Sequence, residues 1–346
     1  PVISETFTGI RKERRKAEMK MWKKGVLLMA ALAVGLTAGC GSTQKTGEKK
    51  NVKVGVVQLV EHQALDAANK GFVDGLAAGG FKEGQNLTLD RQNAQADQSN
   101  LQTIAQRFAN NKEDLICAIA TPAAQTMANV TRDIPIVGTA ITDYKEAKLV
   151  KDPEKPGTNV SGTTDMNPID KQLDLLLKIV PKAKTIGILY NSSEINSQIQ
   201  VKKMKELAEA KGLTVREATV SSVNDIQQSA QSLVGQVDAI YVPTDNVIAS
   251  AMPLLAKITN PAKIPVICGE EGVVKSGALA TIGIDYYKLG YQTGLMAAKI
   301  LKGEAKPQTM PIEKQKDMKV TVNEATAKAL GLTLPEDVLK GASIVK

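Results

Sequence analysis

Histidine, cysteine and aromatic residues are scarce in this chain of 346 residues: one His, three Cys and 3% aromatics. Three cysteines are too few for a disulfide-rich scaffold, and a hydrophobic content of 43% excludes a wholly disordered chain. With His62 alone, a Ser-His-Asp triad has one possible base, and no nucleophile adjoins it in the sequence. Phosphate loops, GxSxG elbows, HExxH motifs and strands followed by GxGxxG are missing as well. These absences argue against an enzyme.

Most of the excess positive charge lies at the start of the chain. Of the net +8, the first 39 residues carry eight basic and three acidic side chains, which leaves +3 on the rest. A nucleic-acid-binding surface needs basic clusters in the folded part. We therefore expect no nucleic-acid partner.

An export signal is predicted at the N-terminus. Gly25–Gly39 is an apolar, uncharged run after Lys23 and Lys24, and it is shorter than the roughly 20 residues of a spanning helix. Residues 36–40, LTAGC, resemble the lipobox of bacterial lipoproteins, which implies lipidation at Cys40. A buried helix that happens to end in Cys is the alternative. We expect a leader over 1–39, which includes residues upstream of the true signal, and a polar lipidated tether over 40–50.

The remaining cysteines, Cys117 and Cys268, each lie within an apolar run and have neither a CxxC pattern nor a neighbouring His. We expect both to be buried free thiols, with no metal and no cofactor.

From residue 52 onward, short β-branched runs alternate with longer helical patterns, which predicts an α/β fold with mainly parallel sheets. The expected strands are 52–59, 87–91, 115–120, 134–140, 185–190, 214–219, 239–242, 264–268 and 279–282. The expected helices are 65–78, 99–110, 123–131, 168–179, 195–211, 223–234, 247–258, 287–302 and 324–330, and the segment 151–168 is rich in turns. Two similar doubly wound lobes are predicted: lobe 1 from 51–163 plus about 284–308, and lobe 2 from 164–283 plus about 309–346.

Ligands of open parallel sheets bind beyond the carboxyl ends of the strands. The loops there carry polar residues that can cap helices, and Thr121, Ser192, Ser193 and Asn196 are predicted caps. Free backbone donors at helix starts can hold a carboxylate, whereas Asp245 and Asp285 would suit an ammonium group. The alternative is that each residue is an ordinary cap. Glu270 and Glu271 could form a glycosidase pair, but adjacent acids at a strand end are more often solvated or capping.

Five spaced motifs resemble the substrate-binding lipoproteins of ABC transporters in the tryptophan/tyrosine-binding group. The resemblance spans Val52 to Gly303 and is carried by QLVEH with ALD (58–66), AIATPAAQ (118–125), LYNSSE with NS (189–197), YVPTDN (241–246) and GIDYY (283–287). It implies a type I periplasmic-binding-protein fold, in which two lobes close on an amino acid that is usually aromatic. The implied ligand-binding residues are Gln58, Glu61, Thr121, Ala123, Ala124, Thr142, Ser192, Ser193, Asn196, Thr244, Asp245, Asn246 and Asp285. His62 would lie at the mouth of the cleft.

The function that follows is a non-enzymatic, lipid-anchored monomer on the extracytoplasmic face of the cell membrane. It would deliver tryptophan, phenylalanine or tyrosine to ABC permease subunits. The alternatives are a sugar or nucleoside receptor of the same fold and a branched-chain amino-acid receptor. A repressor core shares the fold, but the export signal occupies the place of its DNA-binding segment.

Overall fold

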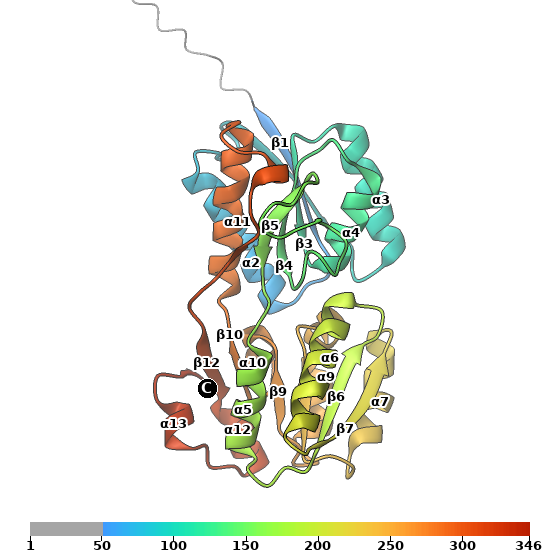
Figure 1. Ribbon diagram of the computed structural model, residues 1–346, viewed down its shortest axis with the longest axis vertical. Coiled ribbons are helices and arrows are strands. Elements are labelled where there is room, and N and C mark those ends of the chain that lie inside the picture. The colour runs from blue at the N-terminus through green and yellow to red at the C-terminus, as the bar shows by residue number, and fades with distance from the viewer. Residues whose placement is uncertain (1–50) are drawn as a thin grey trace, which may run out of the picture. The chain divides into compact units, whose positions relative to one another are not determined.

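The structure is a computed structural model that describes residues 51–346 (Figure 1). The leader, the tether and Cys40 lie outside these residues. Within 51–346, no helix has both the length and the apolar character needed to cross a bilayer.

Lobe 1 is built on a parallel sheet of order β11-β5-β4-β3-β1-β2. Its strands are β1 (Val52–Gln58), β2 (Leu87–Asn93), β3 (Leu115–Ile119), β4 (Ile136–Ile141), β5 (Val160–Thr164) and β11 (Glu313–Lys314). Helices α2 (Gln63–Ala78) and α11 (Tyr286–Leu301) cover one face, while α3 (Gln98–Asn111) and α4 (Thr121–Val130) cover the other (Figure 1).

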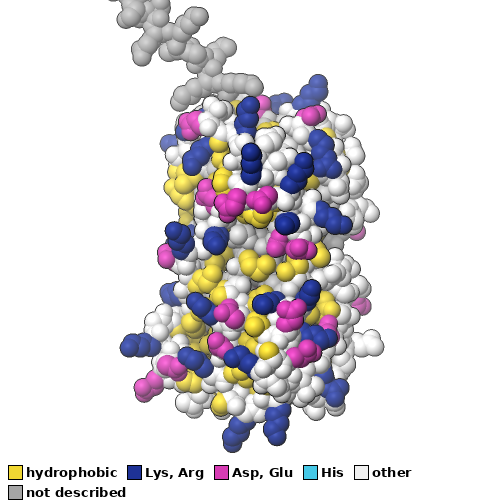
Figure 2. All heavy atoms as spheres, viewed as in Figure 1, with side chains coloured by type: hydrophobic (Ala, Val, Ile, Leu, Met, Phe, Trp, Pro, Cys, Tyr) yellow, Lys and Arg dark blue, Asp and Glu magenta, His cyan; other side chains and the backbone are white. Residues whose placement is uncertain are grey.

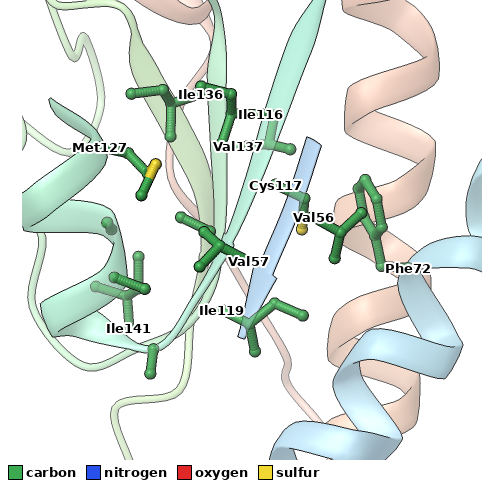
Figure 3. Close-up of a cluster of buried hydrophobic side chains, with 14 of the residues drawn as sticks. Val56, Val57, Phe72, Ile116, Cys117, Ile119, Met127, Ile136, Val137 and Ile141 are labelled. Atoms are coloured by element: carbon green, nitrogen blue, oxygen red, sulfur yellow. The ribbon is translucent and has the colours of Figure 1, made fainter. Parts of the chain in front are cut away.

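The central strands of lobe 1 are apolar on both faces because helices cover both. In Figure 3, Val56 and Cys117 point toward Phe72 of α2, whereas Val57 points toward Met127 of α4. All of these side chains are buried. Continuous hydrophobic runs of this kind are typical of parallel strands buried on both sides. Cys117 and Cys268 are both free and buried, which confirms the expectation from sequence.

Lobe 2 contains a seven-stranded sheet of order β13-β12-β10-β9-β8-β6-β7, parallel except for the pairing of β10 with β12. Its strands are β6 (Thr185–Asn191), β7 (Thr214–Val220), β8 (Ala239–Val242), β9 (Val266–Cys268), β10 (Ala280–Gly283), β12 (Lys319–Asn323) and β13 (Ser343–Val345). One core includes α5 (Ile169–Ile179), α6 (Ile195–Ala210), α12 (Glu324–Leu330) and α13 (Glu336–Leu339). The core of the opposite face includes α7 (Ile226–Leu233), α8 (Asn246–Ser250), α9 (Met252–Thr259) and α10 (Glu271–Lys275).

The chain passes between the lobes three times: after β5, after β10 and after β11. Two of these crossovers are hydrogen-bonded to each other, because Gln315 Nε2 donates to Asp285 O at 2.7 Å and Asp285 N donates to Gln315 Oε1 at 3.3 Å. Asn167, on the first crossover, is buried, and both polar atoms of its side chain are without a hydrogen-bond partner.

The structure differs from the sequence-based expectation in several features, and α10, α13, β12 and β13 were not predicted. The turn-rich segment 151–168 contains β5, whose strand character comes from its pairing with β4. The expected helix 247–258 is divided at Ala251 into α8 and α9, since Pro253 lies in the first turn of α9 and has no N–H to continue α8. β11 pairs with β5, so residues up to 314 belong with the first sheet rather than with the second.

The surface carries charges of both signs. In Figure 2, Lys and Arg side chains are interspersed with Asp and Glu over the visible face of both lobes. This mixture is typical of a solvated surface.

Candidate ligand-binding site

A small cavity of about 10 Å³ lies between the lobes, at the carboxyl ends of the strands. Loops after β1, β4, β5, β8 and β9 all contribute to it, which is the arrangement expected for open parallel sheets. Its lining residues are His62, Leu65, Ala140, Thr142, Asp165, Asn196, Thr244, Asp245, Asn246, Glu270 and Tyr286.

The lobe 1 wall is a hydrogen-bonded group around Asp165. Thr142 Oγ1 donates to Asp165 Oδ1 at 2.9 Å, and Tyr286 Oη donates to Asp165 Oδ2 at 2.7 Å. Ala140 has φ 56°, in the left-handed region, beside an irregularity in the pairing of β4 with β5. Irregular pairing next to a site changes the direction of the side chains that follow. Burial raises the pKa of Asp165, while both hydrogen bonds lower it.

The lobe 2 wall is organised by Glu194, the buried residue before α6. Its Oε2 accepts from Asn196 Nδ2 at 2.9 Å and from Asn246 Nδ2. Burial raises the pKa of Glu194 to about 7, and the nearby Asp245 adds to this increase. Thr244 is held by Gln200, which donates to Thr244 Oγ1 and accepts from its backbone N–H at 3.2 Å.

Asp245 lines the cavity, but donors from within lobe 2 surround its carboxylate. Oδ2 accepts from Asn191 N at 2.6 Å and from Ser197 Oγ at 2.7 Å, and Oδ1 caps α8 by accepting from Ile248 N at 3.0 Å. This side chain therefore connects β6, α6 and α8.

The lobes contact each other directly across the cavity. Thr142 Oγ1 and Thr244 Oγ1 are 3.3 Å apart. His62 Nε2 is 3.3 Å from Asn246 Oδ1, and His62 Nδ1 is 3.6 Å from Glu270 Oε1. The side chains of His62 and Glu270 are only 5% and 3% exposed. The two lobes are therefore in a closed arrangement.

The electrostatics of the site are unbalanced. None of the lining side chains that the structure describes is Lys or Arg, whereas Asp165, Asp245 and Glu270 all line the cavity. Burial raises the pKa of Glu270 to about 8, with Asp165 and Asp245 adding to the increase, and burial lowers the pKa of His62 to about 4. A cation is the group that such a site lacks. In residues 51–346, no cluster of His, Cys, Asp or Glu is arranged to hold a metal ion.

Five of the residues implied by the resemblance line the cavity: Thr142, Asn196, Thr244, Asp245 and Asn246. The others do not line it in this arrangement. Gln58 is buried and bonds to Asp66 and Asn69, and Glu61 is exposed. Ala123 and Ala124 belong to the lobe 1 core, and Asp285 caps α11 by accepting from Lys288 N at 3.1 Å.

The predicted helix caps before α4 and α6 are wrong. Ala120, with φ 86°, takes the capping position of α4, so Thr121 is the first helical residue, and its buried Oγ1 has no hydrogen-bond partner. Ser192 and Ser193 are exposed, because Asn191 forms the turn by accepting from Ser193 N at 2.9 Å. Asn196 lies inside α6 and donates from its side chain to Glu194 and Thr244.

Sequence reasoning did not place Asp165, Glu194 or Tyr286 in a specific role, and it gave Glu270 no part in ligand binding. His62 was expected at the cleft mouth, yet its ring is inside. Tyr286 and Glu270 each follow a predicted strand, so the strand-end rule could have marked them. Asp165 could not be found in this way, since β5 was not predicted.

Two α/β lobes, three crossovers and a buried polar cavity between the lobes define a two-lobed solute receptor of the type I periplasmic-binding-protein fold. Residues 53–346 match the family of ABC transporter substrate binding proteins, and this chain belongs to that family. Substrate-binding proteins of ABC transporters act on the extracytoplasmic side.

Three known proteins are similar to this chain over most of its length. The chain is 46% identical over 316 residues to the tyrosine-binding protein of Clostridioides difficile (strain R20291), covering 89% of this chain and 91% of that protein. A Streptococcus pneumoniae ABC domain solved in complex with L-Trp has 43% identity and a TM-score of 0.83, covering 86% of this chain and all of that one. A ligand-free, open substrate-binding protein from Clostridium difficile has 52% identity and a TM-score of 0.66, covering 85% of this chain and 99% of that one.

The two solved structures also bear on the arrangement of the lobes. The chain superposes better on the L-Trp complex than on the open structure, although its sequence is closer to the latter. Rotation of one lobe against the other lowers the TM-score of a superposition that spans both lobes. This agrees with the closed arrangement that the contacts between the lobes show.

Proposed function

We propose that this protein binds an aromatic L-amino acid between its lobes and presents it to an ABC permease. The observation that carries the proposal is the cavity bordered by three buried acids, with no Lys or Arg among the described lining residues. An amino acid supplies the missing cation through its ammonium group. The names of the relatives, one tyrosine-binding and one in complex with L-Trp, support an aromatic side chain.

The carboxylate of the ligand has a candidate partner at the start of α4. The buried, unpartnered Thr121 Oγ1 is the first side chain of a ten-residue helix. Helix starts favour anions through free N–H groups and the helix dipole. We include Thr121 in the proposed site for this reason, although it does not line the small cavity of the closed arrangement.

The present cavity has room for about one water molecule, so a larger ligand requires the lobes to separate. A sugar or nucleoside is disfavoured because sugar sites commonly stack rings on aromatics, and Tyr286 is the sole aromatic among the described lining residues.

Ligand identity can be tested by fluorescence, because the single Trp, Trp22, precedes Cys40. In protein that starts at Cys40, indole emission comes from the ligand alone. We expect L-tryptophan to bind with a blue shift, since a largely dry site desolvates the indole, and L-tyrosine or L-phenylalanine to displace it. D-Tryptophan is the matched control. If calorimetry shows heat with a sugar, a nucleoside or a branched aliphatic amino acid but none with the aromatic ones, the proposal is wrong.

We also propose that Cys40 carries the lipid that anchors the protein outside the cytoplasm, on the basis of the lipobox-like sequence 36–40. Two acyl chains suffice for stable anchoring, at about 0.8 kcal/mol per buried methylene. Cys40→Ser should move the protein from the membrane pellet to the soluble exported fraction, whereas Cys117→Ser should not. Equal retention of both variants in the pellet would contradict the proposal.

A further inference from the structure

A relay of side chains fixes the protonation of the His62 ring. Asn246 Nδ2 donates to Glu194 Oε2, which also accepts from Asn196 Nδ2, so the Asn246 amide presents its oxygen to His62. His62 Nε2 must then carry the hydrogen that Asn246 Oδ1 accepts at 3.3 Å. Because burial lowers the pKa of His62 to about 4, the ring is neutral and Nδ1 has a free lone pair.

That lone pair faces another acceptor. His62 Nδ1 is 3.6 Å from Glu270 Oε1, and neither buried atom has a hydrogen-bond partner. When Glu270 is ionised, two acceptors on opposite lobes thus border one place that lacks a donor. A buried acceptor left unpaired is destabilising, and more so if it is charged, so this place favours a group with several N–H bonds and a positive charge.

The other acids of the cavity already have donors. Both oxygens of Asp165 accept hydroxyl groups, from Thr142 and Tyr286. Asp245 accepts two backbone N–H groups and the Ser197 hydroxyl. Tyr286 also interacts with the carboxyl group of Glu270. Among the cavity-lining acids that the structure describes, Glu270 is nevertheless the one with a buried oxygen, Oε1, that has no hydrogen-bond partner.

We propose that Glu270 of lobe 2 and Nδ1 of His62 in lobe 1 together receive the ammonium group of the ligand, which makes this pair a specificity-determining contact. The inference rests on the proposed function, since it takes the ligand to be an amino acid. It moves the amine contact away from Asp245 and Asp285. Because the two acceptors come from opposite lobes, the ammonium group also links ligand recognition to closure.

The test compares Glu270→Gln with its neighbour Glu271→Gln. Glu271 pairs with Lys275 on α10 and does not line the cavity. Calorimetry would use L-tryptophan and indole-3-propionate, which keeps the ring and carboxylate but has no amine. We expect E270Q to weaken L-tryptophan binding by about 30-fold or more and to leave indole-3-propionate binding unchanged or stronger. E271Q should behave as the unaltered protein with both ligands.

A second variant tests the other lobe. His62→Asn removes the Nδ1 acceptor while placing a good capping residue at the start of α2. We expect it to weaken L-tryptophan binding by about 3- to 10-fold, again with no loss for indole-3-propionate.

The outcomes separate the two proposals. If the unaltered protein binds no amino acid, the proposed function fails and this inference fails with it. If the unaltered protein binds L-tryptophan and E270Q binds it equally well, or loses affinity equally for both ligands, this inference alone is overturned. If E270Q does not fold, as judged by its thermal transition, the His62→Asn variant decides whether the inference holds. The quantity to compare is then the ratio of its affinities for L-tryptophan and indole-3-propionate.

Discussion

Closing the lobes changes the proton affinities of His62 and Glu270 in opposite directions, because burial disfavours whichever form is charged. In the closed arrangement the pKa of Glu270 is raised to about 8, against about 4.3 for a solvated Glu, and that of His62 is lowered to about 4, against about 6.5. Below pH 8 the closed form therefore takes up a proton on Glu270. Below about pH 6.5 the open form takes one up on His62.

The fraction of closed protein without ligand should consequently rise as the pH falls from 8.5 to 6.5 and rise less steeply below that, where His62 acts in the opposite direction. Glu270 alone contributes about 2 kcal/mol between pH 8 and pH 6.5, at 1.36 kcal/mol per pH unit. Glu194, with a pKa of about 7, and the buried acids Asp165 and Asp245 act in the same direction as Glu270. Tyr286, whose pKa is raised well above 10, stays neutral throughout. Energy transfer between dyes on the two lobes measures the closed fraction.

The Glu270→Gln variant is the control for this pH dependence. The closed fraction of this variant should rise less between pH 8.5 and 6.5. It should decline below pH 6.5, because protonation of His62 favours the open form and Glu270 no longer offsets this effect. A closed fraction that does not vary with pH in the unaltered protein would contradict the argument.

Among individual residues, Asp245 shows where prediction from the sequence is incomplete. Its position after a predicted strand was enough to place it at the cavity. Its partners Asn191 and Ser197 lie about 50 residues away in the sequence, so no local pattern reveals that they engage its carboxylate. The residue type indicated an anion at the site, but the distribution of donors decides which anion is open to a ligand.

Among the elements, α2 and α11 pack at backbone contact through glycines. A Cβ added to Gly290 would lie 1.9 Å from the backbone oxygen of Ala68, and one added to Gly71 would lie 2.1 Å from that of Tyr287. In an exposed helix, Gly→Ala gains up to about 1 kcal/mol. Between α2 and α11 the two helix backbones would have to separate to admit the added methyl group. Gly→Ala is therefore expected to destabilise the protein at these positions.

Gly290→Ala should lower the free energy of unfolding by about 3 kcal/mol, at the upper end of the usual cost of overpacking. Lys299→Ala, an exposed change on the same helix, should stay within about 0.5 kcal/mol. Denaturant unfolding followed by circular dichroism measures both. A Gly290→Ala variant as stable as the unaltered protein would show that the helices separate at little cost.

Helices and strands with a clear hydrophobic periodicity could be predicted from the sequence. Strands that are defined only by pairing with neighbouring strands could not. Helices such as α6 and α11 agree with the sequence pattern to within one or two residues. β5, with the sequence VSGTT, has no alternation and follows a turn-rich segment, so only its neighbours β4 and β11 identify it as a strand.

For the whole molecule, the two-lobe architecture could be predicted from the repeated alternation of strands and helices. The points at which the chain crosses back between the lobes could not, because they depend on pairing between strands that are far apart in the sequence. β11 has two residues, and its place beside β5 is not encoded in its own composition. The contacts across the cavity depend on closure as well, which is why His62 was expected at the mouth rather than inside.

The packing of α2 against α11 also constrains the order in which the protein can assemble. α2 is the first helix of lobe 1, while α11 follows five of the seven strands of lobe 2 in the sequence. Until α11 arrives, the face of α2 that carries Gly71 and Gly75 has no partner, and β5 lacks β11 at its edge. The strands β6 to β10, by contrast, follow one another without interruption by lobe 1. A growing or translocating chain can therefore form the centre of its second lobe before its first lobe is complete, so lobe 1 stays unfinished during most of the chain's emergence.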